Sequence, residues 1–82
     1  MQQSEPAGGI VNGKKAMRIK VNGSDREVDD GIPLVRFLEL LGLKPQATVV
    51  ERNGGIVERS CYSDVVLAEG DVLELVRFVG GG

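Results

Sequence analysis

A run of three glycines, residues 80–82, follows the apolar stretch 72–79 and ends in a carboxylate. Glycines have no side chains to pack and lose more backbone entropy on ordering than other residues, so folding alone gives no reason for this run. Without a Cβ, the run fits extended into a narrow channel of a partner. The sequence therefore predicts that the carboxylate of Gly82 is the functional group and that Gly80 and Gly81 lie in the partner's channel. The alternative is a frayed terminus or a leftover linker.

The side-chain inventory excludes several kinds of catalytic site. Histidine is absent and Cys61 is the only cysteine, so a Cys/His nucleophilic pair, a histidine base, a zinc cluster and an intramolecular disulfide are all excluded. Cys61 itself is expected to be a small, partly buried side chain. The acids Asp29-Asp30 and Glu69 with Asp71 flank turns, where we expect them to hydrogen-bond to backbone instead of binding a metal or catalysing a reaction.

The length of the chain predicts one small domain, and its charge limits the partners that it can bind. The chain has 82 residues and a formal net charge of −2, which argues against the concentrated positive face that nucleic-acid binding requires. Its basic cluster at 14–20 includes alternate strand positions, as expected of a solvated outer face. No stretch is long and apolar enough to cross a membrane, and the beginning of the chain lacks the layout of a secretion signal. We expect a cytoplasmic protein that binds neither nucleic acid nor membrane.

Glycine content and hydrophobic periodicity predict how the chain is organised. Residues 1–16 are polar, glycine-rich and without period, which predicts a disordered N-terminal extension or an artificial leader. The alternation that starts at Met17 predicts a strand over 17–21 and a folded domain over 17–78. Asn22-Gly23 predicts the turn of a hairpin, with a second strand to residue 29. Residues 79–82 are expected to form a flexible glycine tail.

The segment 32–42 changes to the period of a helix. Four apolar residues recur at the spacing of one helical face: Leu34, Phe37, Leu38 and Leu41. Pro33 suits the first helical turn and Gly42 suits the left-handed position after the last turn, with Ile32 in the cap position.

The pattern in the second half of the chain predicts three more strands and the turns between them. Residues 47–52 predict a strand. Which of its side chains face the core stays open, because the apolar residues Val49 and Val50 are adjacent. Asn53-Gly54 predicts a hairpin turn into a brief edge strand, and residues 59–64 predict a turn or one helical turn. The final strand, 72–78, places Leu73 and Leu75 opposite to Glu74.

Three apolar residues near the tail are candidates for docking a partner: Val76, Phe78 and Val79. Exposed apolar patches commonly mark the surfaces through which proteins bind their partners. Two readings of Phe78 stay open, docking or closing the core at the strand end. For Val76 we favour packing against the protein, and for Arg77 we favour a charge that is exposed to solvent.

The predicted order is strand, strand, helix, strand, short strand, loop and strand, with one main helix packed against a mixed sheet of four to five strands. This is an α+β, β-grasp arrangement. Residues 17–82 resemble the ThiS family of sulfur carriers of thiamine biosynthesis, within the ubiquitin-like superfamily. The residues that carry the resemblance are Val21-Asn22-Gly23, Leu38, Leu41-Gly42-Leu43, Asn53-Gly54, Ile56-Val57, Arg59-Ser60, Glu69-Gly70-Asp71 and the ending 76–82. The chain departs from the family at Glu58, where a proline is frequent, and Tyr62 stands for a common aromatic residue.

The resemblance implies a carrier that is not itself an enzyme and that binds no cofactor. A ThiF-like adenylating enzyme would activate the Gly82 carboxylate with ATP and magnesium, and a persulfide donor would convert it to a thiocarboxylate. Thiazole synthase, a ThiG-like protein, would accept the sulfur. The alternatives are a MoaD-like carrier for molybdopterin synthesis, sulfide delivery to another metabolite, and a ubiquitin-like tag or interaction domain without sulfur transfer.

Overall fold

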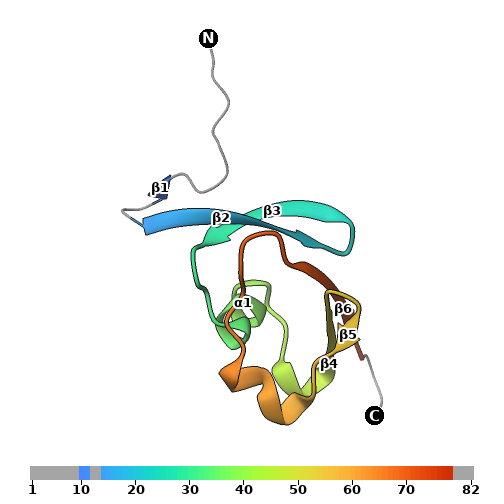
Figure 1. Ribbon diagram of the computed structural model, residues 1–82. Coiled ribbons are helices and arrows are strands. Elements are labelled where there is room, and N and C mark those ends of the chain that lie inside the picture. The colour runs from blue at the N-terminus through green and yellow to red at the C-terminus, as the bar shows by residue number, and fades with distance from the viewer. Residues whose placement is uncertain (1–9, 12–13, 79–82) are drawn as a thin grey trace.

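The computed structural model describes residues 10–11 and 14–78 (Figure 1). Its strands are β1 (Ile10–Val11), β2 (Lys14–Val21), β3 (Ser24–Asp29), β4 (Thr48–Arg52), β5 (Gly55–Ile56) and β6 (Val72–Arg77). Its helices are α1 (Leu34–Leu40) and the two 3-10 helices η1 (Pro45–Ala47) and η2 (Arg59–Asp64).

The strands form one mixed sheet. β6 lies between β2, to which it is parallel, and β4, to which it is antiparallel. β3 pairs with β2 and β5 pairs with β4, both antiparallel. Figure 1 shows α1 beside the β2–β3 hairpin, with β4, β5 and β6 grouped next to it. This arrangement confirms the predicted α+β class with one main helix.

The N-terminal edge of the sheet differs from the prediction. β2 begins at Lys14 instead of Met17, and Ala16 is buried. Two neighbouring strands extend β2. β3 pairs with β2 from Val21 back to Ala16, the Asp30 N–H donates to the Lys15 carbonyl at 2.8 Å, and β1 pairs with β2 at Lys14 and Lys15. β1 adds a sixth strand, where four to five were predicted. The remainder of the predicted extension, 1–9 and 12–13, lies outside the described residues.

The helix begins one position later than its sequence predicts. Pro33 is the N-cap instead of Ile32, because its extended backbone forms a β-bridge with Val66. No side chain caps this end; the Leu34 N–H donates to the Val65 carbonyl at 2.9 Å instead. At the other end Gly42 has the predicted positive φ, 76°, and its N–H donates to the Glu39 carbonyl.

The core lies between α1 and the inner face of the sheet. Three of the four predicted helix positions are buried, and the fourth, Leu41, is partly buried. A fully buried side chain of this size contributes about 1.5–3 kcal/mol. Val50 faces inward at 0% exposure, which settles the facing of β4. From η2, Tyr62 is also buried, and its hydroxyl donates to the Thr48 carbonyl at 2.7 Å.

Both predicted Asn-Gly turns are present, and their asparagines also hold β6. Asn22 and Asn53 have positive φ angles of 49° and 52°, as hairpin turns of this kind require. The Asn22 side chain accepts from the Leu75 N–H at 2.8 Å and donates to the Leu75 carbonyl at 3.3 Å. The Asn53 side chain accepts from the Val72 N–H at 2.9 Å. The two hairpin turns therefore fix the strand that leads to the tail.

Asp71 anchors the start of β6. Its carboxylate is buried and accepts hydrogen bonds from the Ala68 N–H at 2.8 Å, the Asn53 side chain at 3.1 Å and the Arg52 guanidinium at 3.0 Å. Burial raises the pKa of Asp71, but these three donors and the Arg52 charge outweigh it and hold the pKa below its ordinary value of 3.8. The predicted backbone role of this acid is confirmed.

We expect Asp71→Asn to lower the free energy of unfolding by about 2 kcal/mol at neutral pH, because a charged hydrogen-bond acceptor is lost from a buried network. A folded-state pKa below the unfolded value means that this stabilisation is present above the unfolded pKa and is lost as the pH falls through the folded one. Urea unfolding of both proteins across this acidic range should show their difference shrinking. The control Asp64→Asn, at an exposed position, should change stability little at any pH; equal effects of both substitutions would contradict the assignment.

Candidate functional site

The structure describes the base of the predicted tail. β6 ends at Arg77, and the Phe78 N–H donates to the Ala47 carbonyl at 2.8 Å, so the chain is held by the sheet up to residue 78. Val79, Gly80, Gly81 and Gly82 lie outside the described residues. The predicted tail roles therefore stay predictions.

The two candidate docking residues at this base are both exposed. Alternation along β6 buries Leu73 and Leu75, which leaves Val76 on the opposite face with 55% exposure. The packing role favoured for Val76 is therefore wrong. Phe78 is 60% exposed, so it does not close the core. Arg77 is exposed, as expected of a solvated charge.

Val76 belongs to a shallow apolar hollow on the outer face of the sheet. The hollow has a volume of about 380 Å³ and is lined by Val49, Glu51, Ile56, Glu74 and Val76, which we call the outer patch. Val49 pairs with Val76 across β4 and β6, and Ile56 of β5 is 64% exposed. Apolar side chains from β4, β5 and β6 thus line this hollow.

Two carboxylates interrupt this apolar surface. Glu51 and Glu74 are direct cross-strand partners, and neither forms an ion pair with any residue in the described part of the chain. Like charges directly opposite one another destabilise a sheet by a few tenths of a kcal/mol up to about 1 kcal/mol. By strand register, Glu51 lies between Ile56 of β5 and Glu74 of β6, so the outer patch combines apolar and acidic side chains.

Sequence reasoning found Val76 but missed Val49, Ile56 and the two acids. These residues meet through strand pairing, and the facing of β4 was open because Val49 and Val50 are adjacent. The brief edge strand after Asn53-Gly54 was the one available signal that Ile56 lies beside β4.

Other candidate residues do not form a second chemical centre. Cys61 is exposed instead of partly buried, because η2 turns Tyr62 into the core and leaves its neighbour outside. The Glu69 carboxylate accepts from the Arg18 N–H at 3.2 Å, which confirms its backbone role. Within 10–11 and 14–78, no group of His, Cys, Asp or Glu is arranged to hold a metal ion.

The basic residues of β2 lie where the alternation places them. Lys15, Arg18 and Lys20 are exposed, and Lys20 lies 3.9 Å from the Asp25 carboxylate. Among the helices that the structure describes, none is long and apolar enough to span a membrane.

The fold and the site together define a class. A mixed sheet with β6 at its centre, packed on one helix and ending beside an exposed patch, is the β-grasp arrangement of ubiquitin-like domains. The solution structure of the N-terminal ubiquitin-like domain of the 4931431F19Rik protein matches over 100% of this chain with a TM-score of 0.54. At 16% identity that match supports the fold alone.

The comparisons then identify the family. The family model described as the ThiS family matches residues 19–82, so the chain belongs to the ThiS family. The sulfur carrier protein ThiS of Bacillus subtilis is 35% identical over 78% of this chain and 98% of its own length. The crystal structure of the thiamine biosynthesis protein ThiS from Geobacter metallireducens matches with a TM-score of 0.68 at 30% identity, over 80% of this chain and 100% of that one.

A longer protein also contains a related stretch. A protein of Magnetococcus marinus named thiazole synthase is 42% identical to this chain over 66 residues, which make up 80% of this chain. The matched stretch covers only 20% of that relative.

The like-charge pair in the outer patch gives a stability prediction. We expect Glu74→Lys to raise the free energy of unfolding by about 0.5 kcal/mol, because a lysine opposite Glu51 replaces repulsion with attraction. Glu27→Lys is the matched control, since Glu27 lies opposite Arg18 in the β2–β3 pair and the change creates a like-charge pair there. Urea unfolding at low salt should show that the two substitutions change the free energy of unfolding in opposite directions. Changes in the same direction would show that the net charge of the protein, and not the cross-strand pair, determines the effect.

Proposed function

We propose that this chain is a sulfur carrier of thiamine biosynthesis and that its Gly82 carboxylate becomes the thiocarboxylate. The observation that carries the proposal is the ThiS family match, which extends through residue 82 and so includes the glycine run. The geometry supports it, because β6 is fixed up to Phe78 by neighbouring strands and side chains. A fixed base limits the entropy that a partner must remove to position the tail.

The chemistry requires partner enzymes. A carboxylate is a poor acyl donor, so we propose that a ThiF-like adenylating enzyme with bound ATP and magnesium activates it. The Gly82 carboxylate oxygen attacks the α-phosphorus and pyrophosphate leaves. The terminal persulfide sulfur of the donor then forms a C–S bond to the Gly82 carbonyl carbon and displaces AMP. A thiol reductant supplies two electrons that cleave the S–S bond of the donor persulfide, which leaves the thiocarboxylate on Gly82 and a thiol on the donor.

The chain supplies the carried group and the docking surface in this scheme. Its sequence contains no histidine and only one cysteine, so the acid–base chemistry falls to the partners. We therefore propose a carrier that is not an enzyme. The exposed free thiol of Cys61 is compatible with a reducing compartment, which supports a cytoplasmic location.

Thiazole synthase is the proposed sulfur acceptor. The support is the Magnetococcus marinus relative, in which a stretch 42% identical to this chain is part of a protein named thiazole synthase. A carrier domain that acts with this enzyme would account for such a combination.

Intact-mass spectrometry tests the carrier chemistry. The full chain is incubated with ATP, magnesium, the ThiF-like enzyme and a persulfide donor. We expect one terminal oxygen to be replaced by sulfur, and we expect Gly81→Ala and Gly82→Ala to be loaded at least about tenfold more slowly, because an added methyl group obstructs a narrow channel. An isopeptide adduct, or an unchanged mass with every activating enzyme tried, would contradict the proposal.

Gly55→Ala is the matched control for this experiment. Gly55 lies in β5, its φ is not positive, and a Cβ built there would come no closer than 3.8 Å to the Arg52 carbonyl oxygen. The control variant should fold and be loaded as fast as the parent. Slow loading of this variant would mean that any glycine substitution disturbs the protein.

The outer patch and Phe78 are proposed to dock the adenylating enzyme. We expect Phe78→Ala to raise the KM of that enzyme for the carrier about tenfold and Val76→Thr about threefold, because buried apolar area is lost from the complex. The rate at saturating carrier should change little. Val66→Thr is the control, since Val66 is also exposed, at 53%, but lies outside the outer patch. Equal KM values for all four proteins would exclude docking at this face.

A further inference from the structure

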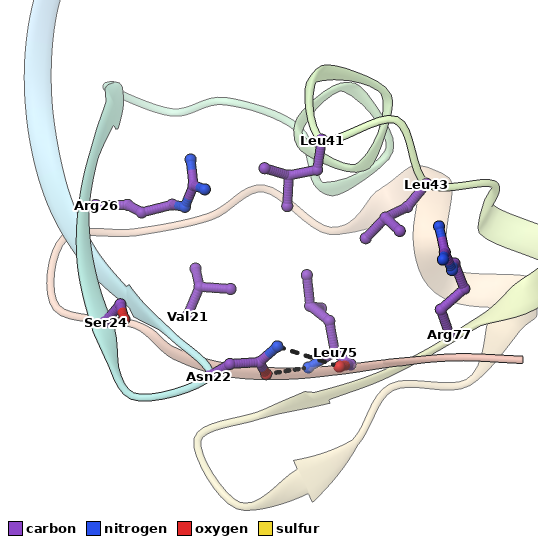
Figure 2. A pocket seen from close by; sticks show the side chains of 8 residues that line it. All are labelled: Val21, Asn22, Ser24, Arg26, Leu41, Leu43, Leu75 and Arg77. Carbon is purple, nitrogen blue, oxygen red and sulfur yellow. Dashed lines mark hydrogen bonds between the residues drawn. The ribbon is translucent and has the colours of Figure 1, made fainter.

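A second hollow lies on the helix-facing side of the sheet, where the end of α1 meets the β2–β3 turn (Figure 2). Its volume is about 390 Å³. Val21, Leu41, Leu43 and Leu75 supply apolar walls, and Arg26 and Arg77 supply the charged ones. We call it the arginine hollow.

Strand register places both arginines on this side. Arg26 of β3 pairs with the buried Ile19, and Arg77 of β6 pairs with the buried Thr48, and directly opposed residues share a face of the sheet. Figure 2 shows the two guanidinium groups at opposite sides of the hollow, with Leu41 and Leu43 between them. The site is therefore cationic at both sides and apolar in the middle.

Neither guanidinium group has a partner within the part of the chain that the structure describes. Other arginines do, since Arg36 pairs with Glu39 and Arg52 with Asp71, whereas Arg26 and Arg77 make no ion pair or side-chain hydrogen bond there. Among the described residues, no acidic one lines the hollow, although the whole chain carries a formal charge of −2. The local charge thus opposes the net charge, and an anionic ligand would neutralise it.

The walls of the hollow are fixed before any ligand arrives. Asn22 holds the Leu75 backbone through two hydrogen bonds. The Leu43 N–H donates to the Leu38 carbonyl at 2.9 Å, which closes the helix end around Gly42. Little ordering of backbone is then required on binding, which favours affinity.

The arrangement selects among anionic ligands. A single phosphate can pair with a guanidinium group, but it gains nothing from the leucine and valine walls. A peptide with an aliphatic side chain between two carboxylates matches all three features. We propose that the arginine hollow binds an acidic–aliphatic segment of a partner protein, in which leucine-like side chains enter the middle and flanking carboxylates pair with Arg26 and Arg77. This surface is distinct from the outer patch, and its binding does not depend on the sulfur chemistry.

NMR titration of the ¹⁵N-labelled full chain tests the proposal. The probe is the capped peptide Glu-Glu-Leu-Leu-Glu-Glu at low salt, compared with Gln-Gln-Leu-Leu-Gln-Gln, Glu-Glu-Ala-Ala-Glu-Glu and inorganic phosphate. We expect the first peptide to shift the amides of Ser24, Leu41 and Leu43 and to bind at least about fivefold more tightly than the other three probes. Added salt should weaken its binding.

Substitutions separate this site from the general charge of the protein. The double variant Arg26→Gln with Arg77→Gln should bind the first peptide roughly fivefold more weakly, while Arg36→Gln, on the exposed face of α1, should bind like the parent. The shifts of amides outside the hollow should show that each variant stays folded. The proposal is overturned by the absence of shifts, by equal binding of the glutamine or alanine peptide, by phosphate shifting the same amides as strongly, or by concentration-dependent shifts without peptide, which would mean that a second copy of this chain occupies the hollow.

Discussion

The central position of β6 is the constraint on which the rest of the structure depends. This strand is parallel to β2 on one side and antiparallel to β4 on the other, so its backbone is bonded along both edges. Both hairpin turns add to this, because Asn22 and Asn53 bond to its backbone in addition to reversing the chain. The buried Asp71 carboxylate fixes the turn just before it. A strand held in this way gives the residues after Phe78 a fixed starting point.

The side chains of β6 alternate between the two faces of the sheet, and they contribute to a different surface on each face. Leu73 and Leu75 enter the core, whereas Val76 on the other face belongs to the outer patch. Arg77 returns to the helix side, where it lines the arginine hollow. A partner that reaches the base of the tail therefore meets an apolar, acidic surface on one face and a basic one on the other. Opposite charges on the two faces affect the orientation in which a partner approaches more than they increase its binding affinity.

Membership of the ThiS family rests on a match that extends to residue 82. The similarity to the Geobacter metallireducens structure, with a TM-score of 0.68 at 30% identity, shows that the fold is kept while most side chains differ.

Local patterns in the sequence determined much of this protein. Both Asn-Gly turns, the helix face with Phe37 and Leu38, the glycine that ends the helix and the inward side of the last strand follow from residues close to one another in the chain. Tertiary structure decided the rest, since strand pairing joins distant segments. Pairing with β3 and β1 set the start of β2, and pairing of β4 with β6 settled the facing of Val50 and brought Glu51 opposite Glu74. The exposure of Cys61 and the meeting of Arg26 with Arg77 at one hollow likewise depend on packing between segments far apart in sequence, which no local period encodes.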